Sequence, residues 1–384
     1  MKSNQLVFVV ACLSFFALGL PDGALGVAWP HIRHEMSLPL DRVNVLFLIH
    51  SVFFAAASGL IGRMSAFLRL EHINQLGIVL MAVGFFGYSI APSFAVLALM
   101  TVLTGSGMAM IDASNNAYSS KNFSSSANIF LSCAWGLGAA VSPIVISRFI
   151  LMLNWRAGYV SVAAIQSGVA VVALVSLLRG VWREEENRIA LNEQVTLEQG
   201  FLSKKRYQFL NVFIFFLYVG AEHSSGFWVT SVLLESRGMD IGAAAAFPAV
   251  YYASIMAGRF IFGYLAKRFS NIFLVRFGLA LATAGLLIMS VSNSLFGMSL
   301  IGLGFAPVHP CTMHQTSKRF GPLITTKLVG YQVAAGGLGV ALLSSLVGII
   351  LTRVSLEALF LVVFIFAVLT FLINELLERK CSRL

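Results

Sequence analysis

The sequence Gly136-Leu137-Gly138 recurs 201 residues later as Gly337-Leu338-Gly339. Four further glycine pairs share this offset, namely Gly19/Gly220, Gly62/Gly263, Gly77/Gly278 and Gly84/Gly285. Only about one or two such pairs would match at any fixed offset by chance, so the chain is a tandem duplication. Both copies are almost wholly apolar. The sequence therefore predicts two membrane-embedded halves, related by an axis along the membrane normal, with a binding site between them.

The composition also indicates a membrane protein. Of the 384 residues, 58% are hydrophobic and only 11% are charged, which is far from the range of a soluble domain. The net charge of +10 comes from basic residues scattered through short loops, so it indicates topology and gives no reason to expect a nucleic-acid partner. The four cysteines lack metal-ligand spacing, and we assign them no disulfide, metal or cofactor.

Apolar runs long enough to cross the hydrocarbon core predict an all-α protein with twelve transmembrane helices. The predicted spans are 5–29, 43–62, 73–91, 94–117, 127–149, 158–178, 208–231, 242–263, 272–291, 295–312, 326–351 and 357–377. Six fall in an N-terminal half, 1–178, and six in a C-terminal half, 208–384. The polar segment 179–207 is interpreted as a solvated cytoplasmic linker.

Loop charges predict the orientation of the chain. With both termini in the cytoplasm, the inside segments hold nineteen Lys and Arg residues and the outside segments hold six. The positive-inside rule therefore predicts an integral protein of the cell (inner) membrane with cytoplasmic termini. We expect a monomer whose partners are the lipid bilayer, protons and a small-molecule substrate.

Twelve spans in two parallel halves with a charged middle loop resemble the major facilitator superfamily, and the resemblance covers the whole chain. The loop after the second span usually reads Gly-x-x-x-Asp-Arg in that family. Here the two copies begin at Gly62 and Gly263, and the aspartate is replaced by Ala66 and Lys267. The charge latch that the family builds at this position is therefore not expected in its usual form.

Three phrases resemble the fucose–proton symporter group within that superfamily. They are 20–26 (LPDGALG), 105–116 (GSGMAMIDASNN) and Gly220-Ala221-Glu222 followed by 226–228 (GFW). The resemblance implies sugar binding and proton coupling by acids in helices 1 and 4, which correspond to Asp22 and Asp112. It also implies an acid in helix 7, which corresponds to Glu222. The helix-4 acid is commonly glutamate in that group.

The same acids stand out by physical argument, because an ionisable residue inside a span normally faces a cavity or a partner. Asp22 follows Pro21, and flanking glycines predict a break in the helix that would aim backbone groups at a ligand. Asp112 and Asn116 share a helix face. Either these acids exchange protons in a cavity, or they are structural groups bonded to neighbouring helices.

The duplication adds two histidines to the candidate site. At offset 201 Asp22 corresponds to His223, and the alignment of Gly105-x-Gly107 with Gly302-x-Gly304 places Asp112 opposite His309. We interpret both histidines as substrate contacts, with packing as the alternative. Because adjacent helical residues point about 100° apart, only one of Glu222 and His223 should face the centre, and we favour Glu222.

Prolines and neutral side chains complete the prediction. Pro307 and Pro310 flank His309 and should kink or unwind helix 10. An aromatic face with amide donors suits a sugar, and the substrate-binding candidates of this kind are Asn116, Trp135, Gln166, Tyr331 and Gln332. Trp29 and Trp228 fit either this face or interface anchors. Arg259 is interpreted as structural.

The predicted function is secondary active transport of a small polar solute, a sugar or related compound, by proton symport with alternating access. Proton-coupled efflux of amphipathic compounds is the alternative. A sensor that binds without transport stays open, whereas the dispersal of ionisable residues over helices 1, 4, 7 and 10 argues against an intramembrane enzyme with catalytic residues.

Overall fold

A computed structural model describes residues 3–65, 67–122, 125–180, 205–320 and 322–381. The predicted linker 179–207 lies largely outside these residues. The described part is helical, with these elements: α1 (Ser3–Glu35), η1 (Leu40–Val43), α2 (Asn44–Met64), α3 (Leu70–Ser89), α4 (Phe94–Asn122), α5 (Ser125–Met152), α6 (Trp155–Leu178), α7 (Lys205–Ser231), η2 (Val232–Ser236), α8 (Ile241–Leu265), α9 (Asn271–Val291), α10 (Leu295–Phe305), α11 (Val308–Phe320), α12 (Pro322–Arg353) and α13 (Ala358–Cys381).

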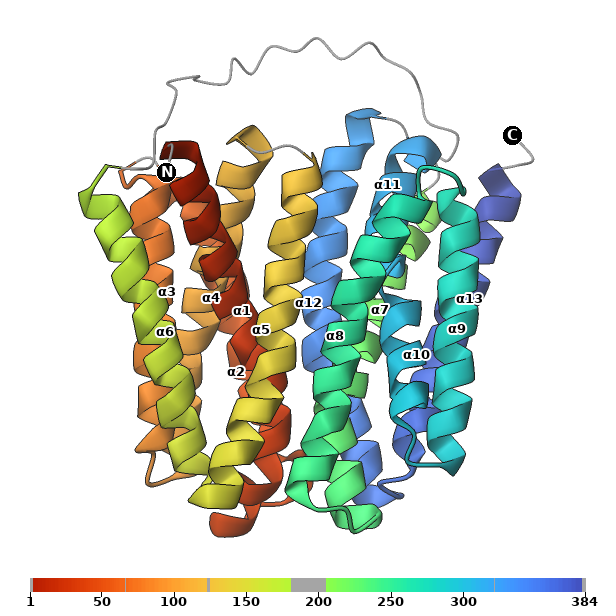
Figure 1. The fold of residues 1–384 in the computed structure, drawn as a ribbon. Helices are drawn as coiled ribbons and strands as arrows, with labels where there is room; N and C mark the ends of the chain where they lie inside the picture. Colours follow the sequence, from red (N-terminus) through yellow and green to blue (C-terminus); the bar gives the residue numbers. More distant parts are fainter. Residues whose placement is uncertain (1–2, 66, 123–124, 181–204, 321, 382–384) are drawn as a thin grey trace.

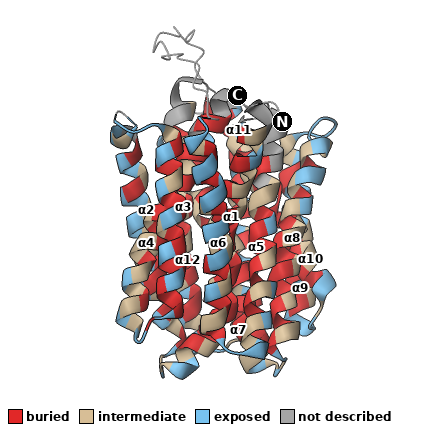
Figure 2. Ribbon diagram, turned by 60° about the vertical axis from the view of Figure 1, so that its left-hand side comes forward, coloured by how far each residue is buried: buried red, intermediate tan, exposed pale blue. Residues whose placement is uncertain are grey.

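Twelve spans in the described residues are long and apolar enough to cross a membrane, which confirms the predicted number. Helices α1–α6 form one bundle and α7–α13 form the other, side by side (Figure 1). We call the end that holds the start of α1, the end of α6 and the start of α7 the terminal face, and the opposite end the distal face. Buried residues run along the inside of the bundles, and the outward faces are exposed (Figure 2). Many outward side chains are large and apolar, such as Phe86, Leu99, Val171, Phe260 and Leu361, as expected for contact with lipid.

The repeated glycines mark close helix crossings inside each half. A Cβ on Gly138 would lie 2.0 Å from the carbonyl oxygen of Phe16, and a Cβ on its repeat partner Gly339 would lie 2.2 Å from the carbonyl oxygen of Phe216. Only glycine lets the α1/α5 and α7/α12 backbones approach this closely. Gly77 in α3 and Gly278 in α9 allow equivalent crossings with α4 and α10. The two halves therefore repeat the same close helix crossings as well as the same glycine spacing.

Two proline predictions had different outcomes. The predicted interruption of helix 10 is confirmed, because α10 ends at Phe305 and α11 begins at Val308. The predicted break at Asp22 is wrong: α1 continues through Pro21 and Pro30 to Glu35. A proline inside a spanning helix is tolerated when neighbouring helices enclose the freed backbone groups, and α5, α6 and α7 pack against α1.

Ion pairs hold the distal ends of the helices. Within the N-terminal half, Arg156 Nη2 lies 2.7 Å from Glu35 Oε1. Within the C-terminal half, Arg237 Nη2 lies 2.5 Å from Glu357 Oε2. Arg156 and Glu357 are equivalent at offset 201, so the two halves use the same position with opposite charge. These clamps stabilise each half as a unit.

A separate ion pair joins the two halves at the distal face. Arg33 of α1 donates from Nε to Glu235 Oε1 of η2 at 2.9 Å, and its Nη2 pairs with the other carboxylate oxygen. Asn44 of α2 also donates to the carbonyl oxygen of Ser345 in α12 at 3.1 Å. The halves are thus closed against each other at the distal face.

Candidate transport site between the two halves

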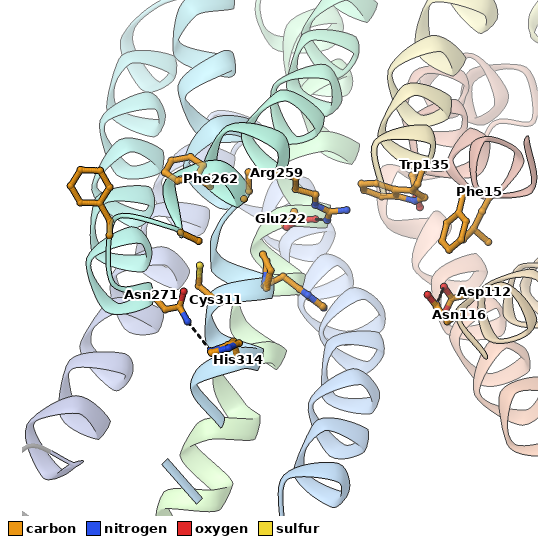
Figure 3. A pocket seen from close by; sticks show the side chains of 18 of the residues that line it. Phe15, Asp112, Asn116, Trp135, Glu222, Arg259, Phe262, Asn271, Cys311 and His314 are labelled. Atoms are coloured by element: carbon orange, nitrogen blue, oxygen red, sulfur yellow. Dashed lines mark hydrogen bonds and ion pairs between the residues drawn. The ribbon is translucent and has the colours of Figure 1, made fainter. Parts of the chain in front are cut away.

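A cavity of about 800 Å³ lies between the halves and extends from the middle of the spans to the terminal face. Its deep end is lined by Asp22 of α1, Trp135 of α5, Glu222 of α7 and Arg259 of α8 (Figure 3). Its other end reaches Ser270 in the α8–α9 connection and Lys318 in α11. With the distal face closed, this arrangement is open to one side of the membrane only.

Asp22 connects the two halves through both its side chain and its backbone. Trp135 Nε1 donates to Asp22 Oδ2 at 2.9 Å. Tyr252 of α8 donates from its hydroxyl to the Asp22 carbonyl oxygen at 3.0 Å, and its ring edge meets the Trp135 ring. The carboxyl group is therefore held in place by an indole of its own half, while its backbone is held by the opposite half.

Glu222 of α7 lines the same deep end from the C-terminal half. It accepts a hydrogen bond from Tyr218 one turn earlier in α7, and its carbonyl oxygen accepts from Tyr251 at 2.7 Å. Arg259 Nη2 lies 3.9 Å from Glu222 Oε1, which is an ion pair without a direct hydrogen bond. The Arg259 guanidinium also lies 4.6 Å from the centre of the Trp135 ring, as a cation–π contact.

These contacts form a chain from Asp22 through Trp135 and Arg259 to Glu222. In Figure 3 the Arg259 and Trp135 side chains point toward each other across the cavity. Arg259 thus pairs directly with Glu222 and reaches Asp22 only through Trp135.

Asp112 and Asn116 lie nearer the terminal face, on the α4 wall of the same cavity. Asn116 Nδ2 donates to Asp112 Oδ1 at 2.8 Å, as the shared helix face predicts. They lie across the cavity from Cys311 and His314 of α11 (Figure 3). His314 in turn contacts Asn271 at 2.9 Å. The carboxyl group of Asp112 has no cation within ion-pair distance among the described residues, so its partner is an amide.

The two predicted histidines lie in different places relative to the first cavity. His223 lines a second cavity and bonds through Nδ1 to Ser344 Oγ at 2.9 Å, in agreement with a role in packing α7 against α12. His309 lines both cavities, between the rings of Phe215 and Tyr218. Glu222 lines both cavities whereas His223 lines only the second, so the two neighbours do face different directions.

Three predicted substrate contacts lie away from the deep end. Gln166 is fully buried inside the N-terminal half and lines neither cavity. Tyr331 is 51% exposed on the outer surface of α12 and also lines neither. Gln332 borders the second cavity, but its Nε2 donates to Thr316 at 2.8 Å beside the buried Arg319 cluster. These spans are apolar on all sides, so the sequence does not reveal which way a polar residue points.

Arg259 lies among the candidate site residues, although the sequence predicts a structural role for it. It was interpreted as structural because it lies near the end of its span, where a long side chain can reach the interface. Instead it lies at the deep end, beside Glu222 and Trp135. The available signal was an arginine with no acid nearby in its own helix. Among the described residues, no three His, Cys, Asp or Glu side chains gather as a metal site.

Comparison with known proteins agrees with this geometry. Residues 8–323 match the sequence pattern of the Major Facilitator Superfamily. The chain is 23% identical to the glucose/mannose transporter GlcP of Bacillus subtilis (strain 168) over 353 residues, covering 87% of this chain and 85% of that one.

Two solved structures share the fold. One is a bacterial homologue of the human lysosomal transporter Spinster, in an inward-facing and occupied conformation, with TM-score 0.76, 15% identity and coverage of 99% and 98%. The other is the nucleoside transporter NupG, with TM-score 0.75, 13% identity and coverage of 98% and 99%. The fold and the family match together show that this chain is a transporter, not an enzyme, and that it belongs to the major facilitator superfamily.

Proposed function

We propose that the chain is a proton-coupled symporter of a small polar solute of the sugar class. The solute binds at the deep end of the cavity, between Asp22 and Trp135 on one side and Glu222 and Arg259 on the other. The observation that carries this proposal is the chain of contacts that links these four residues across the two halves. A solute that replaces the contact between Trp135 and Arg259 acts on both halves at once.

The chemistry of the deep end suits a polyol. Carboxylate oxygens accept hydrogen bonds from hydroxyl groups, the guanidinium donates to them, and the Trp135 ring offers an apolar face for a sugar ring. Asn116 adds an amide on the path toward the terminal face. The likeness to the glucose/mannose transporter GlcP supports the same substrate class.

The proposed proton coupling is supported by the presence of one guanidinium and two carboxyl groups at the deep end. While Arg259 pairs with Glu222, Asp22 depends on the Trp135 indole alone. A proton on either carboxyl group removes the unpaired charge and lets the loaded halves separate at one face and close at the other. Asp112, which has only Asn116 as a partner, is the second candidate for the proton.

We propose that the protein lies in the cell (inner) membrane with its terminal face toward the cytoplasm. We also propose that it is a monomer. The positive-inside rule supports this orientation. It makes the described conformation inward-facing. Cysteines introduced at Phe67, an exposed residue on the terminal face, and at Pro39, an exposed residue on the distal face, test it in a cysteine-free background. An impermeant thiol reagent should label position 39 and not position 67 from outside intact cells, and the opposite pattern contradicts the assignment.

Transport by purified protein in proteoliposomes tests the function. We expect an inward proton gradient to drive accumulation of one member of a panel of glucose, mannose, fucose, nucleosides and amphipathic drugs, and a protonophore to abolish it. Asp22→Asn should lose accumulation but retain exchange of solute, because an amide keeps the shape and cannot carry the proton. Proton-driven movement in the opposite direction would make the chain an efflux antiporter, and saturable binding without flux would make it a sensor.

A further inference from the structure

A second cavity of about 810 Å³ lies between α2 and α12, beside the proposed solute site and on the side away from Trp135 and Arg259. It shares Asp22, Glu222 and His309 with the first cavity as part of its inner wall, but the rest of its lining is mostly apolar. Its size is within the range of about 300–1,000 Å³ that small-molecule sites occupy.

The duplication explains why this space exists. In the C-terminal half, Tyr252 and Met256 of α8 fill the interface with α5, and a Cβ on Gly136 would lie 2.7 Å from Met256 Cβ. At offset 201 their equivalents in α2 are Ser51 and Ala55, both of which line the second cavity. The equivalent of Gly136 is Gly337, and a Cβ there would meet nothing within 4 Å. The small side chains of α2 thus leave a space at the α2/α12 interface, whereas the large side chains of α8 fill the equivalent space at the α5/α8 interface.

The cavity opens toward the membrane and not toward the distal solution. At the distal end α2 and α12 are in contact, since Asn44 bonds to Ser345 and a Cβ on Gly348 would lie 2.9 Å from Asn44 Oδ1. From about one turn beyond that contact, along α2 and α12, the edges of the cavity carry large apolar side chains that are about half exposed. These are Leu48, Val52, Val333, Leu338 and Leu342. A ligand at this opening arrives from the hydrocarbon region.

The inner end of the cavity carries a polar atom without a partner. His50 Nε2 is buried and makes no hydrogen bond to any described residue. His50 lines the cavity together with His223, whose Nδ1 already bonds to Ser344. A buried polar atom is normally satisfied, so a ligand group that bonds to His50 would complete the site. The Asp22 and Glu222 carboxyl groups in the same wall disfavour an anionic head group.

We propose that this cavity binds a single-chain amphiphile from the membrane, with its chain between α2 and α12 and an uncharged hydroxyl-bearing head at His50. A monoacylglycerol has this chemistry. The head at His50 lies apart from Trp135 and Arg259, which do not line this cavity, and its occupancy does not depend on the direction or coupling of transport.

Photolabelling of the full chain in nanodiscs tests the proposal with a monoacylglycerol that carries a diazirine in its acyl chain. We expect saturable labelling of peptides from α2 and α12, with unlabelled monoacylglycerol competing at least tenfold better than the fatty acid of the same length at neutral pH. His50→Leu should weaken labelling about tenfold. Equal competition by the fatty acid would overturn the assigned head group.

The repeat supplies a plugging variant and its control. Ala55→Met installs the residue that its equivalent, Met256, already uses to close α8 against α5, and should reduce labelling at least tenfold. Ala56→Met makes the same change on the neighbouring outward face of α2, which lines neither cavity, and should leave labelling unchanged. If Ala55→Met does not fold, as judged by gel filtration and thermal melting, Gly337→Leu adds bulk from the other wall, at a position where a Cβ would meet nothing within 4 Å.

Labelling that is equal in the plugging and control variants, or spread evenly over the outward helices, would identify only bulk lipid and overturn the site. Trp135→Phe separates this proposal from the proposed function. It should impair solute transport and leave the photolabelling of α2 and α12 unchanged, so that failure of one proposal is visible without failure of the other.

Discussion

The ion pair between Arg33 and Glu235 should hold the distal face closed, and Arg33→Gln is the perturbation that tests this. The pair joins α1 of one half to η2 of the other, so it exists only while the halves meet at that face. The variant removes both hydrogen bonds and leaves Glu235 with His34 at 4.0 Å as its remaining basic neighbour among the described ion pairs. We expect the distally closed state to lose population.

The magnitude follows from the burial of the pair. The Arg33 and Glu235 side chains are 17% and 15% exposed. Surface ion pairs contribute about 0.2–1 kcal/mol, whereas removal of one partner of a buried pair costs about 3–5 kcal/mol. An intermediate loss of about 1.5–3 kcal/mol applies here. Since about 1.4 kcal/mol corresponds to a factor of ten, the ratio of distally open to closed molecules should rise roughly 10- to 100-fold.

Thiol labelling measures this ratio. Val43 is fully buried in η1, which packs against α12 of the other half. In a cysteine-free background, a small maleimide should label Val43→Cys roughly 10- to 100-fold faster when Arg33→Gln is added. The double variant Arg33→Glu with Glu235→Arg should restore the slow rate.

The matched control is Arg156→Gln. It breaks a distal ion pair of similar kind, but one that lies within a single half. It should leave the labelling of position 43 unchanged. Equal rates in both variants, or no increase with Arg33→Gln, would refute the idea that this pair controls opening.

Three further predictions concern the site and the scaffold. Trp135→Phe keeps an aromatic ring but loses the hydrogen bond from the indole to the α1 carboxylate, which is worth about 1.5–3 kcal/mol. The apparent affinity for solute in proton-driven uptake should therefore be roughly 10- to 100-fold weaker. Unchanged uptake kinetics would contradict this. Gly138→Ala places a methyl group 2.0 Å from an α1 carbonyl oxygen and should lower the thermal unfolding temperature in detergent, whereas Gly168→Ala, where a Cβ meets nothing within 4 Å, should not. Hydrogen bonds from Arg237 lower the pKa of Glu357 below its ordinary value of 4.5, so their stabilisation is present above that pH and lost as pH falls through the lowered pKa. Between about pH 6 and about pH 3 the parent should therefore lose more thermal stability than Glu357→Gln, and equal losses would rule this linkage out.

The repeated glycine spacing predicted the architecture because glycine is required where two helix backbones are in direct contact. Wherever a backbone carbonyl lies against Gly138 or Gly339, no other residue fits, so the duplicated spacing survives in the sequence. The number of spans and the interruption of helix 10 at Pro307 were predictable for similar reasons of chain geometry. Pro21 was misjudged because the enclosure of α1 by three helices is a tertiary property.

The site was predictable only in part. Asp22, Asp112 and Glu222 were identified because acids inside spans are costly, and all three line the central cavity. Gln332 and Tyr331 show the limit: neighbours on α12, one is fully buried and the other is half exposed. In a helix that is apolar on all sides, the sequence does not show which of the two residues faces the interior of the bundle.

The central claim is that solute and proton move together through the cavity between the halves. Proteoliposomes that contain a pH indicator and start without a pH or solute gradient test it most directly, on addition of the solute that the panel identifies. The account predicts that solute entry acidifies the interior of parent proteoliposomes, and that the Asp22→Asn variant shows no such acidification. Solute entry without acidification, or with alkalinisation, would contradict proton symport.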